Sequence, residues 1–297
     1  MKKVGILRGG EGEHYESSLR EGGEVLAHIL ENLSDKYKPV DILVDKNGVW
    51  HLQGVPITPA SLMHQVDVVW DTSHPSHSAI LENFSIPHVG AGHFSRVLEE
   101  SRAMLEEHMK GIGVNMPRHI ILSLYQEDFD GPKGKYAIKK AKEVHAKFGA
   151  PWMVKSLTPD LSIGVHVANT FPELINAIED VVAHERSILV EELIAGKEAS
   201  MHSVSGFRNE DIYIFPPLGM STQEKDKLIN LAKDLHVHLC ANHYLNSQFV
   251  LHPKRGIFLT AIDFSPNLKK DSAFHQACQS VGAKMHQVIE HILERAL

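Results

Sequence analysis

The feature that most constrains the fold is the alternation of short apolar runs with amphipathic segments in the first 92 residues. The opening run, Val4 to Leu7, ends at Gly9-Gly10, and the segment 16–33 that follows has the apolar spacing of a helix. A hairpin is expected around Asn47-Gly48, and further runs typical of strands lie at 39–45, 66–71 and 86–92. Strands that alternate with helices form a mainly parallel sheet covered on both faces. We therefore predict an α/β domain over residues 1–92.

The rest of the chain predicts two further domains that mix helices and strands. For a central α+β domain over 93–193, we predict helices at 94–113 and 134–149, a helix with Pro172 in its first turn, and strands at 118–123, 151–156, 163–168 and 187–193. For a C-terminal domain over 194–297, we predict strands at 197–205, 210–215, 243–251 and 256–263, and helices at 222–238 and 272–295. The predicted fold class is α/β and α+β, in three domains.

Charge and hydropathy exclude several classes of function. The chain has 297 residues and a formal charge of -7. A dedicated nucleic-acid-binding protein needs a basic face, so this charge argues against one and favours small-molecule chemistry. No apolar run approaches the roughly 20 residues of a membrane-spanning helix, and the first residues lack the apolar region of a secretory signal. We therefore expect a cytoplasmic protein with no membrane partner.

Two groups of residues have side chains that can bind metals but lack the spacing or the number of ligands that a metal site needs. His236, His238 and His243 are close in the sequence, yet no cysteine or acid completes a ligand set. Cys240 and Cys278 have no metal-ligand spacing and are typical of small core residues in a reducing compartment. We expect no metal site from these residues.

Two cations and one strand exit are candidates for nucleotide binding. Lys155 ends a predicted strand and faces a loop, and Arg102 lies early in a predicted helix. Cations in such places often bind phosphate, and a solvated charge at the end of an element is the alternative for each. The strand exit 190–198 could offer backbone groups to a base and the carboxylate of Glu198 to a ribose. The alternative there is a charged strand end.

Taken in order, these segments resemble the D-alanine–D-alanine ligase family of the ATP-grasp superfamily over nearly the whole chain. RGGEGEHYESSL (8–19) resembles the family's Gly-Gly turn and Glu-x-Ser-Leu helix start, and 78–92 resembles the end of its first domain. ILVEELIAGKE (188–198) resembles its adenine-binding hinge. The resemblance implies the ATP-grasp fold, with a nucleotide cleft between the central and C-terminal domains.

The resemblance also implies roles for individual residues. Glu16 would orient the amino substrate, with Ser18 as its partner. The residues implied to bind the nucleotide are Arg102 and Lys155 at the phosphates, Glu191 and Leu193 at the base, and Glu198 at the ribose. ATP and magnesium are the implied cofactors, a D-amino acid or similar small molecule is the implied substrate, and a homodimer is the implied assembly.

The predicted metal site departs from the family pattern. Gln248 aligns with the family's aspartate, Ala261 with its glutamate and Asp263 with its asparagine, so one carboxylate remains of two. Magnesium in nucleotide sites relies on one or two carboxylates together with the phosphates, so Asp263 and Gln248 could hold one ion weakly. Asn246 stands where the family has the arginine that stabilises the oxyanion.

Other segments around the predicted site also depart from the family. In TPDLSIG (158–164), Pro159 and Asp160 replace glycines of the phosphate loop, which hinders the approach of backbone amides to phosphate. His74 and His77 lie in the altered segment that helps shape the amino-acid site, and the family's long loop over the active site is missing.

Two hypotheses follow. An active ligase would phosphorylate a carboxylate with ATP and join the acyl phosphate to an amine. A catalytically inactive relative would retain the fold for binding or regulation, which the changes at Asn246, Gln248 and Ala261 favour. The retained Glu16 and Lys155 favour ligand binding in either case. The sequence leaves both hypotheses open.

Overall fold

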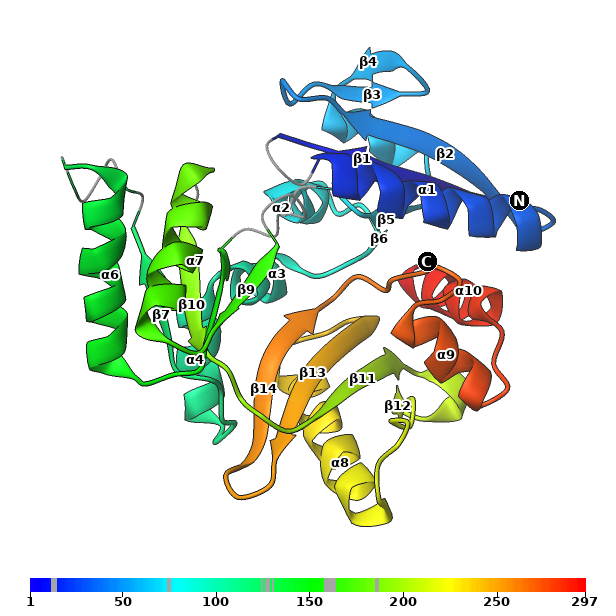
Figure 1. Ribbon diagram of the computed structural model, residues 1–297. Coiled ribbons are helices and arrows are strands. Elements are labelled where there is room, and N and C mark those ends of the chain that lie inside the picture. Colours follow the sequence, from blue (N-terminus) through cyan, green and yellow to red (C-terminus); the bar gives the residue numbers. More distant parts are fainter. Residues whose placement is uncertain are drawn as a thin grey trace. The chain divides into compact units, whose positions relative to one another are not determined.

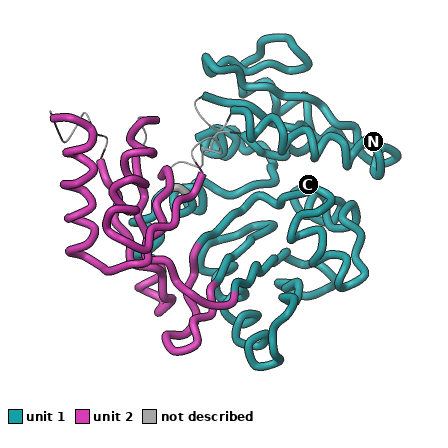
Figure 2. Tube along the Cα trace, in the orientation of Figure 1, with its two compact units in different colours: residues 1–108, 198–249, 261–297 teal, residues 109–197, 250–260 magenta. Residues whose placement is uncertain are grey.

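A computed structural model of the chain describes residues 1–11, 15–73, 76–123, 125, 129, 131–157, 164–184 and 187–297. Within these ranges the chain forms two compact units, which Figure 2 colours separately. Unit 1 comprises Met1–His108, Glu198–Phe249 and Ala261–Leu297, and unit 2 comprises Met109–Lys197 and Val250–Thr260. His74, Pro159 and Asp160, for which the sequence made predictions, lie outside the described residues.

The first part of unit 1 is a six-stranded, mainly parallel sheet. Its elements are β1 (Lys2–Gly9), α1 (Tyr15–Asn32), β2 (Tyr37–Val44), β3 (Trp50–Leu52), β4 (Val55–Ile57), the 3-10 helix η1 (Pro59–His64), β5 (Val68–Asp71), α2 (Ser76–Asn83) and β6 (His88–Val89). The strand order is β4-β3-β2-β1-β5-β6 (Figure 1). β2, β1, β5 and β6 pair in parallel, and β3 and β4 add antiparallel strands. The predicted mainly parallel sheet is confirmed, including the hairpin after β2.

The remaining elements of unit 1, some of which continue into unit 2, form a second sheet with helices. They are α3 (His93–Glu100), α4 (Arg102–Gly111), β11 (Lys197–Ser205), the 3-10 helix η2 (Phe207–Asn209), β12 (Ile212–Ile214), α8 (Thr222–His238), β13 (Tyr244–His252), β14 (Gly256–Asp263), α9 (Ala273–Ser280) and α10 (Met285–Ala296). The strand order of this sheet is β12-β11-β13-β14. All four predicted C-terminal strands are present.

Two long helices predicted from the sequence are wrong, because each is split in the structure. The predicted helix at 94–113 is divided into α3 and α4 at Ser101, whose ψ of 96° is extended. The predicted helix at 272–295 is divided into α9 and α10. Gly282, between them, has a φ of 69°, in the left-handed region that commonly ends a helix.

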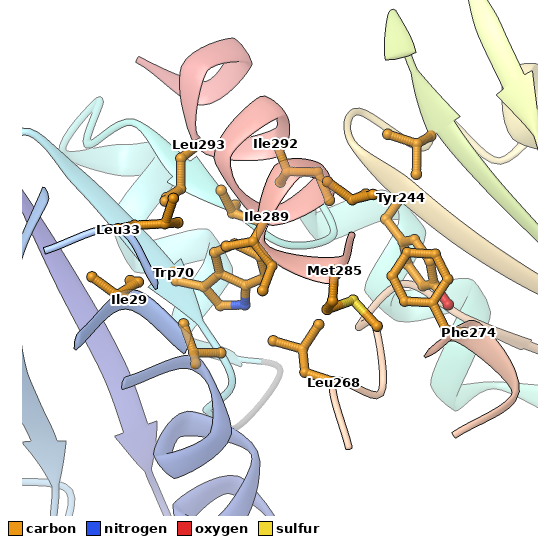
Figure 3. Packing of buried hydrophobic residues seen from close by; sticks show 14 of the residues in the cluster. Ile29, Leu33, Trp70, Tyr244, Leu268, Phe274, Met285, Ile289, Ile292 and Leu293 are labelled. Atoms are coloured by element: carbon orange, nitrogen blue, oxygen red, sulfur yellow. The ribbon is translucent and has the colours of Figure 1, made fainter. Parts of the chain in front are cut away.

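One apolar core joins the N-terminal sheet to the C-terminal helices of unit 1. Trp70 from β5 packs with Ile29 and Leu33 from α1 and with Ile289 and Leu293 from α10 (Figure 3). All five side chains are buried. Full burial of such side chains contributes about 1.5–3 kcal/mol each, so α10 stabilises the N-terminal sheet as well as its own neighbours.

Unit 2 is built on a four-stranded antiparallel sheet with two helices on one face. Its elements are β7 (His119–Leu122), α6 (Lys133–Lys147), β8 (Trp152–Ser156), β9 (Val165–Ala168), α7 (Phe171–Ala183) and β10 (Ile188–Glu192). The strand order is β7-β10-β8-β9, and α6 and α7 pack against the sheet through a core that includes Trp152, Val154 and Val190. Among the described residues of the whole chain, no helix is long and apolar enough to cross a membrane.

Candidate active site

The face of the unit 2 sheet that points away from α6 and α7 carries an unusual set of side chains. Residues directly opposite each other in antiparallel strands share a face, so the strand register defines this set. The set, called the open face below, consists of His119 and Ile121 on β7, Met153 and Lys155 on β8, Val165 and Val167 on β9, and Leu189 and Glu191 on β10. Val165 and Val167 are 59% and 51% exposed, so apolar side chains remain accessible beside charged ones.

An ion pair lies within the open face. Lys155 Nζ is 2.7 Å from Glu191 Oε2, and the Glu191 side chain is 1% exposed whereas that of Lys155 is 30% exposed. The buried carboxylate therefore holds the ammonium group of Lys155 at the accessible surface of the sheet. The structure thus brings together two of the predicted nucleotide-binding residues. An ammonium beside exposed apolar side chains can bind phosphate next to a flat, apolar base.

The predicted hinge leaves the sheet directly after Glu191. The backbone N–H of Glu192 donates to the carbonyl of Arg118 at 2.8 Å, and that of Leu193 donates to the carbonyl of Pro151 at 3.0 Å. The Leu193 N–H is therefore already used inside unit 2, which leaves the Leu193 carbonyl as the backbone group that could bind a base. Ile194, the next residue, was not predicted as a site residue, but its N–H has no such partner in the described part of the chain.

Other open-face residues were also missed by sequence reasoning, notably Met153 and Val165. Their signal was present in the alternation of side chains along each strand. Alternation alone does not say which face carries the helices, because both faces of this sheet contain apolar residues. The pairing of β8 with β9 and β10 shows that these residues lie on the same face as Lys155 and Glu191.

The predicted amino-substrate residues lie where β1 ends and α1 begins. Gly9 has a φ of 88°, and a Cβ there would lie 2.2 Å from the carbonyl oxygen of Val44, so only glycine fits this turn. The Gly9 N–H donates to Ser18 Oγ at 2.7 Å in a buried contact. Ser18 therefore holds the glycine turn. Glu16 is exposed in the first turn of α1, 3.9 Å from the ammonium of Lys46.

A series of hydrogen-bonded side chains lies beyond the end of β5, in the segment where the sequence departs from the ligase family. Asp71 Oδ1 accepts hydrogen bonds from the N–H and the hydroxyl of Ser73, at 2.9 and 2.6 Å. Ser73 Oγ is 2.9 Å from His77 Nδ1, and all three side chains are buried. Because the Ser73 hydroxyl donates to Asp71, it accepts from His77, so this histidine carries its proton on Nδ1.

Asp263, at the end of β14, lies among other acids. Burial and the charges of Glu99 and Glu21 raise the pKa of Asp263 to about 7, although the Ser265 N–H and Arg96 oppose the shift. The Ser265 N–H donates to Asp263 Oδ1 at 2.7 Å, and Arg96 is bound to Glu99 Oε2 at 2.9 Å. The Asp263 carboxyl is therefore only partly ionised near neutral pH.

These residues do not fit a magnesium ion held by the protein alone. Among the residues that the structure describes, no three His, Cys, Asp or Glu side chains are grouped so that they could hold a metal ion. Ala261 has no side-chain donor atom, Gln248 offers only an amide oxygen, and Asp263 is the single carboxylate of the three. Magnesium in nucleotide sites relies on carboxylate and phosphate oxygens, so without a nucleotide this donor set would hold the ion only weakly.

Asn246, which aligns with the family's oxyanion arginine, is held in place by hydrogen bonds across β11 and β13. Ser200 Oγ donates to Asn246 Oδ1 at 2.7 Å and lies 3.3 Å from His202 Nε2. His202 Nδ1 is in turn 2.7 Å from the Tyr244 hydroxyl. The Asn246 amide oxygen thus accepts from Ser200, and the amide NH2 is the donor group of this side chain.

The predicted site residues are divided between the two units. Lys155, Glu191 and Leu193 belong to unit 2. The others belong to unit 1: Glu16, Ser18, Arg102, Glu198, Gln248 and Asp263. Arg102 is buried at the start of α4, and Glu198 is exposed on β11.

Comparisons with known proteins agree with this fold. The family described as "D-ala D-ala ligase C-terminus" matches residues 109–218. The chain is 22% identical to a D-alanine–D-alanine ligase of Carboxydothermus hydrogenoformans over 98% of this chain and 97% of that protein. It is also 22% identical to the vancomycin/teicoplanin A-type resistance protein VanA of Enterococcus faecium, over 99% of this chain and 98% of that protein.

Solved structures show the same architecture. D-alanyl-alanine synthetase A of Vibrio cholerae superposes with a TM-score of 0.76 at 14% identity, over 99% of this chain and 98% of that one. The D-alanine–D-alanine ligase of Bacillus anthracis, solved in complex with ATP, superposes with a TM-score of 0.74 at 17% identity, over 100% and 97% of the two chains. The chain therefore has the ATP-grasp fold. The family match over residues 109–218 and the relatives aligned over nearly the whole chain support the resemblance to the D-alanine–D-alanine ligase family that was predicted from the sequence.

Proposed function

We propose that this protein is a D-alanine–D-alanine ligase-like enzyme, which uses ATP to join the carboxylate of one small amino acid to the amine of another. The observation that carries this proposal is the Lys155–Glu191 ion pair on the open face. A buried acid that holds a lysine at an accessible, partly apolar surface suits the phosphates and base of a nucleotide. In the predicted site, Arg102 adds a second cation for the phosphates and Glu198 a carboxylate for the ribose.

The proposed reaction has two steps. A carboxylate oxygen of the first amino acid attacks the γ-phosphorus of ATP, the bond to ADP breaks, and an acyl phosphate forms. The amine of the second amino acid, after losing a proton, then attacks the acyl carbon and releases phosphate as the C–N bond forms.

The protein's own residues would bind and orient these reactants. Glu16 would hold an ammonium group, and Ser18 would keep the turn before it in shape. Lys155 would offset the charge of the phosphates. The Asn246 amide nitrogen would donate to the oxyanion of the second step, where such donors are commonly worth about 2.7–4 kcal/mol.

Of the predicted cofactors, ATP is the one that the open face supports. Magnesium would depend mainly on phosphate oxygens, with Asp263 and Gln248 as its protein ligands. We also propose the three-domain division at residues 92 and 193 and a cytoplasmic location, both from the sequence pattern, and a homodimer from the resemblance to the ligase family.

A coupled assay tests the proposed activity. Purified protein is incubated with ATP, magnesium chloride and D-alanine, and both phosphate release and the dipeptide are measured, the latter by mass spectrometry. We expect dipeptide in an amount equal to the phosphate released, and less of both products with Lys155→Ala when ATP is below saturation. L-alanine in place of D-alanine tests the predicted substrate class.

The second candidate function is nucleotide binding without catalysis. Ala261 favours it, because this residue offers no metal ligand where the family pattern has a glutamate. Calorimetry with ATP, with and without magnesium, separates the two candidates. ATP binding without phosphate release or dipeptide would support the non-catalytic protein and contradict the ligase.

A further inference from the structure

A three-residue ion cluster lies immediately beside the proposed base-binding hinge, entirely within unit 2. Arg118 Nε donates to Glu192 Oε2 at 2.9 Å, and the guanidinium of Arg255 donates to both Glu192 oxygens, at 2.5 and 3.3 Å. Burial alone would raise the pKa of Glu192, but the hydrogen bonds and charges of both arginines lower it to about 2. We call this cluster the Glu192 clamp.

The Glu192 clamp connects three separate segments of unit 2. Arg118 immediately precedes β7, Glu192 ends β10, and Arg255 lies between β13 and β14. The backbone reinforces the first connection, because the Glu192 N–H donates to the Arg118 carbonyl at 2.8 Å. Arg255 is itself oriented by the Phe258 ring, whose centroid is 4.8 Å from its guanidinium carbon. The end of β10 is therefore held from both sides.

Two further contacts hold the hinge just beyond Glu192. Ile194 is buried in a small apolar cluster with Val250 and Phe258. At Gly196, a Cβ would lie 2.3 Å from the carbonyl oxygen of Leu251, so the two backbones touch. The backbone groups between Glu192 and Gly196 are the candidates for base recognition. Contacts at both ends of this segment thus hold them in position.

The clamp joins one buried carboxylate to two arginines that face solvent. The side chains of Arg118 and Arg255 are 57% and 43% exposed, whereas that of Glu192 is 9% exposed. Both arginines bind the same carboxylate, so the Glu192 side chain has one defined position at the end of β10. The backbone that leaves β10 after Glu192 therefore starts from a fixed point.

We propose that Glu192, held by Arg118 and Arg255, is a positioning residue that sets the hinge backbone for recognition of the nucleotide base. This inference rests on the proposed function, because it assumes that the hinge binds a base. The clamp would not bind the phosphates, because Lys155 on the open face would bind them. Loss of the clamp should therefore weaken recognition of the base and leave recognition of the phosphates unchanged.

The test compares ATP, GTP and inorganic tripolyphosphate as probes of binding by calorimetry. Glu192→Gln removes the charge with little change in shape, and Arg255→Gln serves as a second variant at a more exposed position. The control is Glu143→Gln, which removes the same charge from another pair in unit 2, between the partly exposed Glu143 and the buried Lys140, 3.0 Å apart on α6. We expect both clamp variants to bind ATP about tenfold more weakly, the effect of one misplaced hydrogen bond, and to prefer ATP over GTP less than the wild type does.

Each outcome of this test has a defined meaning. Unchanged tripolyphosphate affinity in the clamp variants, with Glu143→Gln like wild type for all three probes, supports the positioning role. If both clamp variants keep the ATP affinity and the ATP-to-GTP ratio of the wild type within twofold, the inference is wrong. Equal losses for ATP and tripolyphosphate would indicate a general structural effect and also overturn it. If the wild type binds no ATP, the proposed function itself fails, and this inference fails with it.

Discussion

Unit 1 should lose stability on mild acidification, because the buried His202 and His236 and the partly buried His243 are held in their neutral form. Burial lowers the pKa of His202, His236 and His243 from 6.5 to about 4 in each case. His236 illustrates why the neutral form is preferred. Its two ring nitrogens lie 2.7 Å from the hydroxyls of Ser203 and Ser205, with no water-facing side to receive an added charge.

The bonding around His236 also defines its tautomer. The Ser203 hydroxyl donates to the Leu245 carbonyl at 3.0 Å, so it can only accept from His236 Nδ1. Nε2 is therefore unprotonated and accepts from the Ser205 hydroxyl. An added proton would go to Nε2 and reverse the hydrogen bond with Ser205, and it would place a charge in a buried site.

The sign and size of the effect follow from the pKa values. Between pH 6.5 and 4 the unfolded histidines bind more protons than the folded ones, so stability falls as the pH falls through this window. From pH 7.5 to 5, each histidine costs about 2 kcal/mol and the three together about 6 kcal/mol. Asp263 acts in the opposite direction, because its pKa of about 7 lies above its unfolded value of 3.8, so it offsets part of this loss over the same interval. The expected net loss is on the order of a few kcal/mol, a large share of the roughly 5–15 kcal/mol that stabilises a typical protein.

Urea unfolding at pH 7.5 and pH 5.0 measures this loss. His236→Gln removes one of the three titrating groups, so the loss between the two pH values should shrink by about 2 kcal/mol, even if the variant is less stable at both. His238→Gln is the matched control, because His238 is exposed at the end of the same helix. It should leave the loss unchanged.

The reasoning would be refuted by a His236→Gln variant that loses as much stability between pH 7.5 and 5.0 as the wild type does. That result would mean that His236 is protonated as readily in the folded as in the unfolded protein. A wild type whose stability rises on acidification would show that Asp263 and the other acids dominate the histidines.

Two further predictions concern the nucleotide site. Lys155→Ala should weaken ATP binding, measured by calorimetry, by about tenfold and more than Glu16→Ala does, because the lysine faces phosphate charge and the glutamate faces an amino substrate; equal, negligible effects would contradict both assignments. Replacing Ala261 and Gln248 together by Glu and Asp should increase the effect of magnesium on ATP affinity, because magnesium prefers carboxylate oxygens. An unchanged magnesium response would mean that these two positions do not face the phosphates. We do not expect the double change alone to produce dipeptide if the wild type makes none.

Local signals in the sequence predicted most of the secondary structure. The helix expected at 222–238 is found over the same residues, because Ser221 and Glu224 form a capping box at its start. The break at Gly282 was missed, since a glycine inside a helical pattern does not by itself reveal a left-handed φ. That conformation depends on how α9 and α10 pack.

The candidate site was less predictable, because it depends on contacts between distant segments. Lys155 and Glu191 were each named from the sequence, but their pairing follows from the register of β8 and β10. Asp263 was expected to be a metal ligand, and its acidic surroundings come from Glu99, 164 residues earlier in the chain. Spacing along the sequence contains no information on either contact.

The shared core of unit 1 has a consequence for synthesis on the ribosome. Trp70, Ile29 and Leu33 are made early in translation, but Ile289 and Leu293, which pack against them, are made only after the whole of unit 2 (Figure 3). The apolar face that the N-terminal sheet shares with α1 therefore remains partly uncovered until α10 has left the exit tunnel. During that interval the nascent chain is a natural client for a chaperone that binds apolar surface.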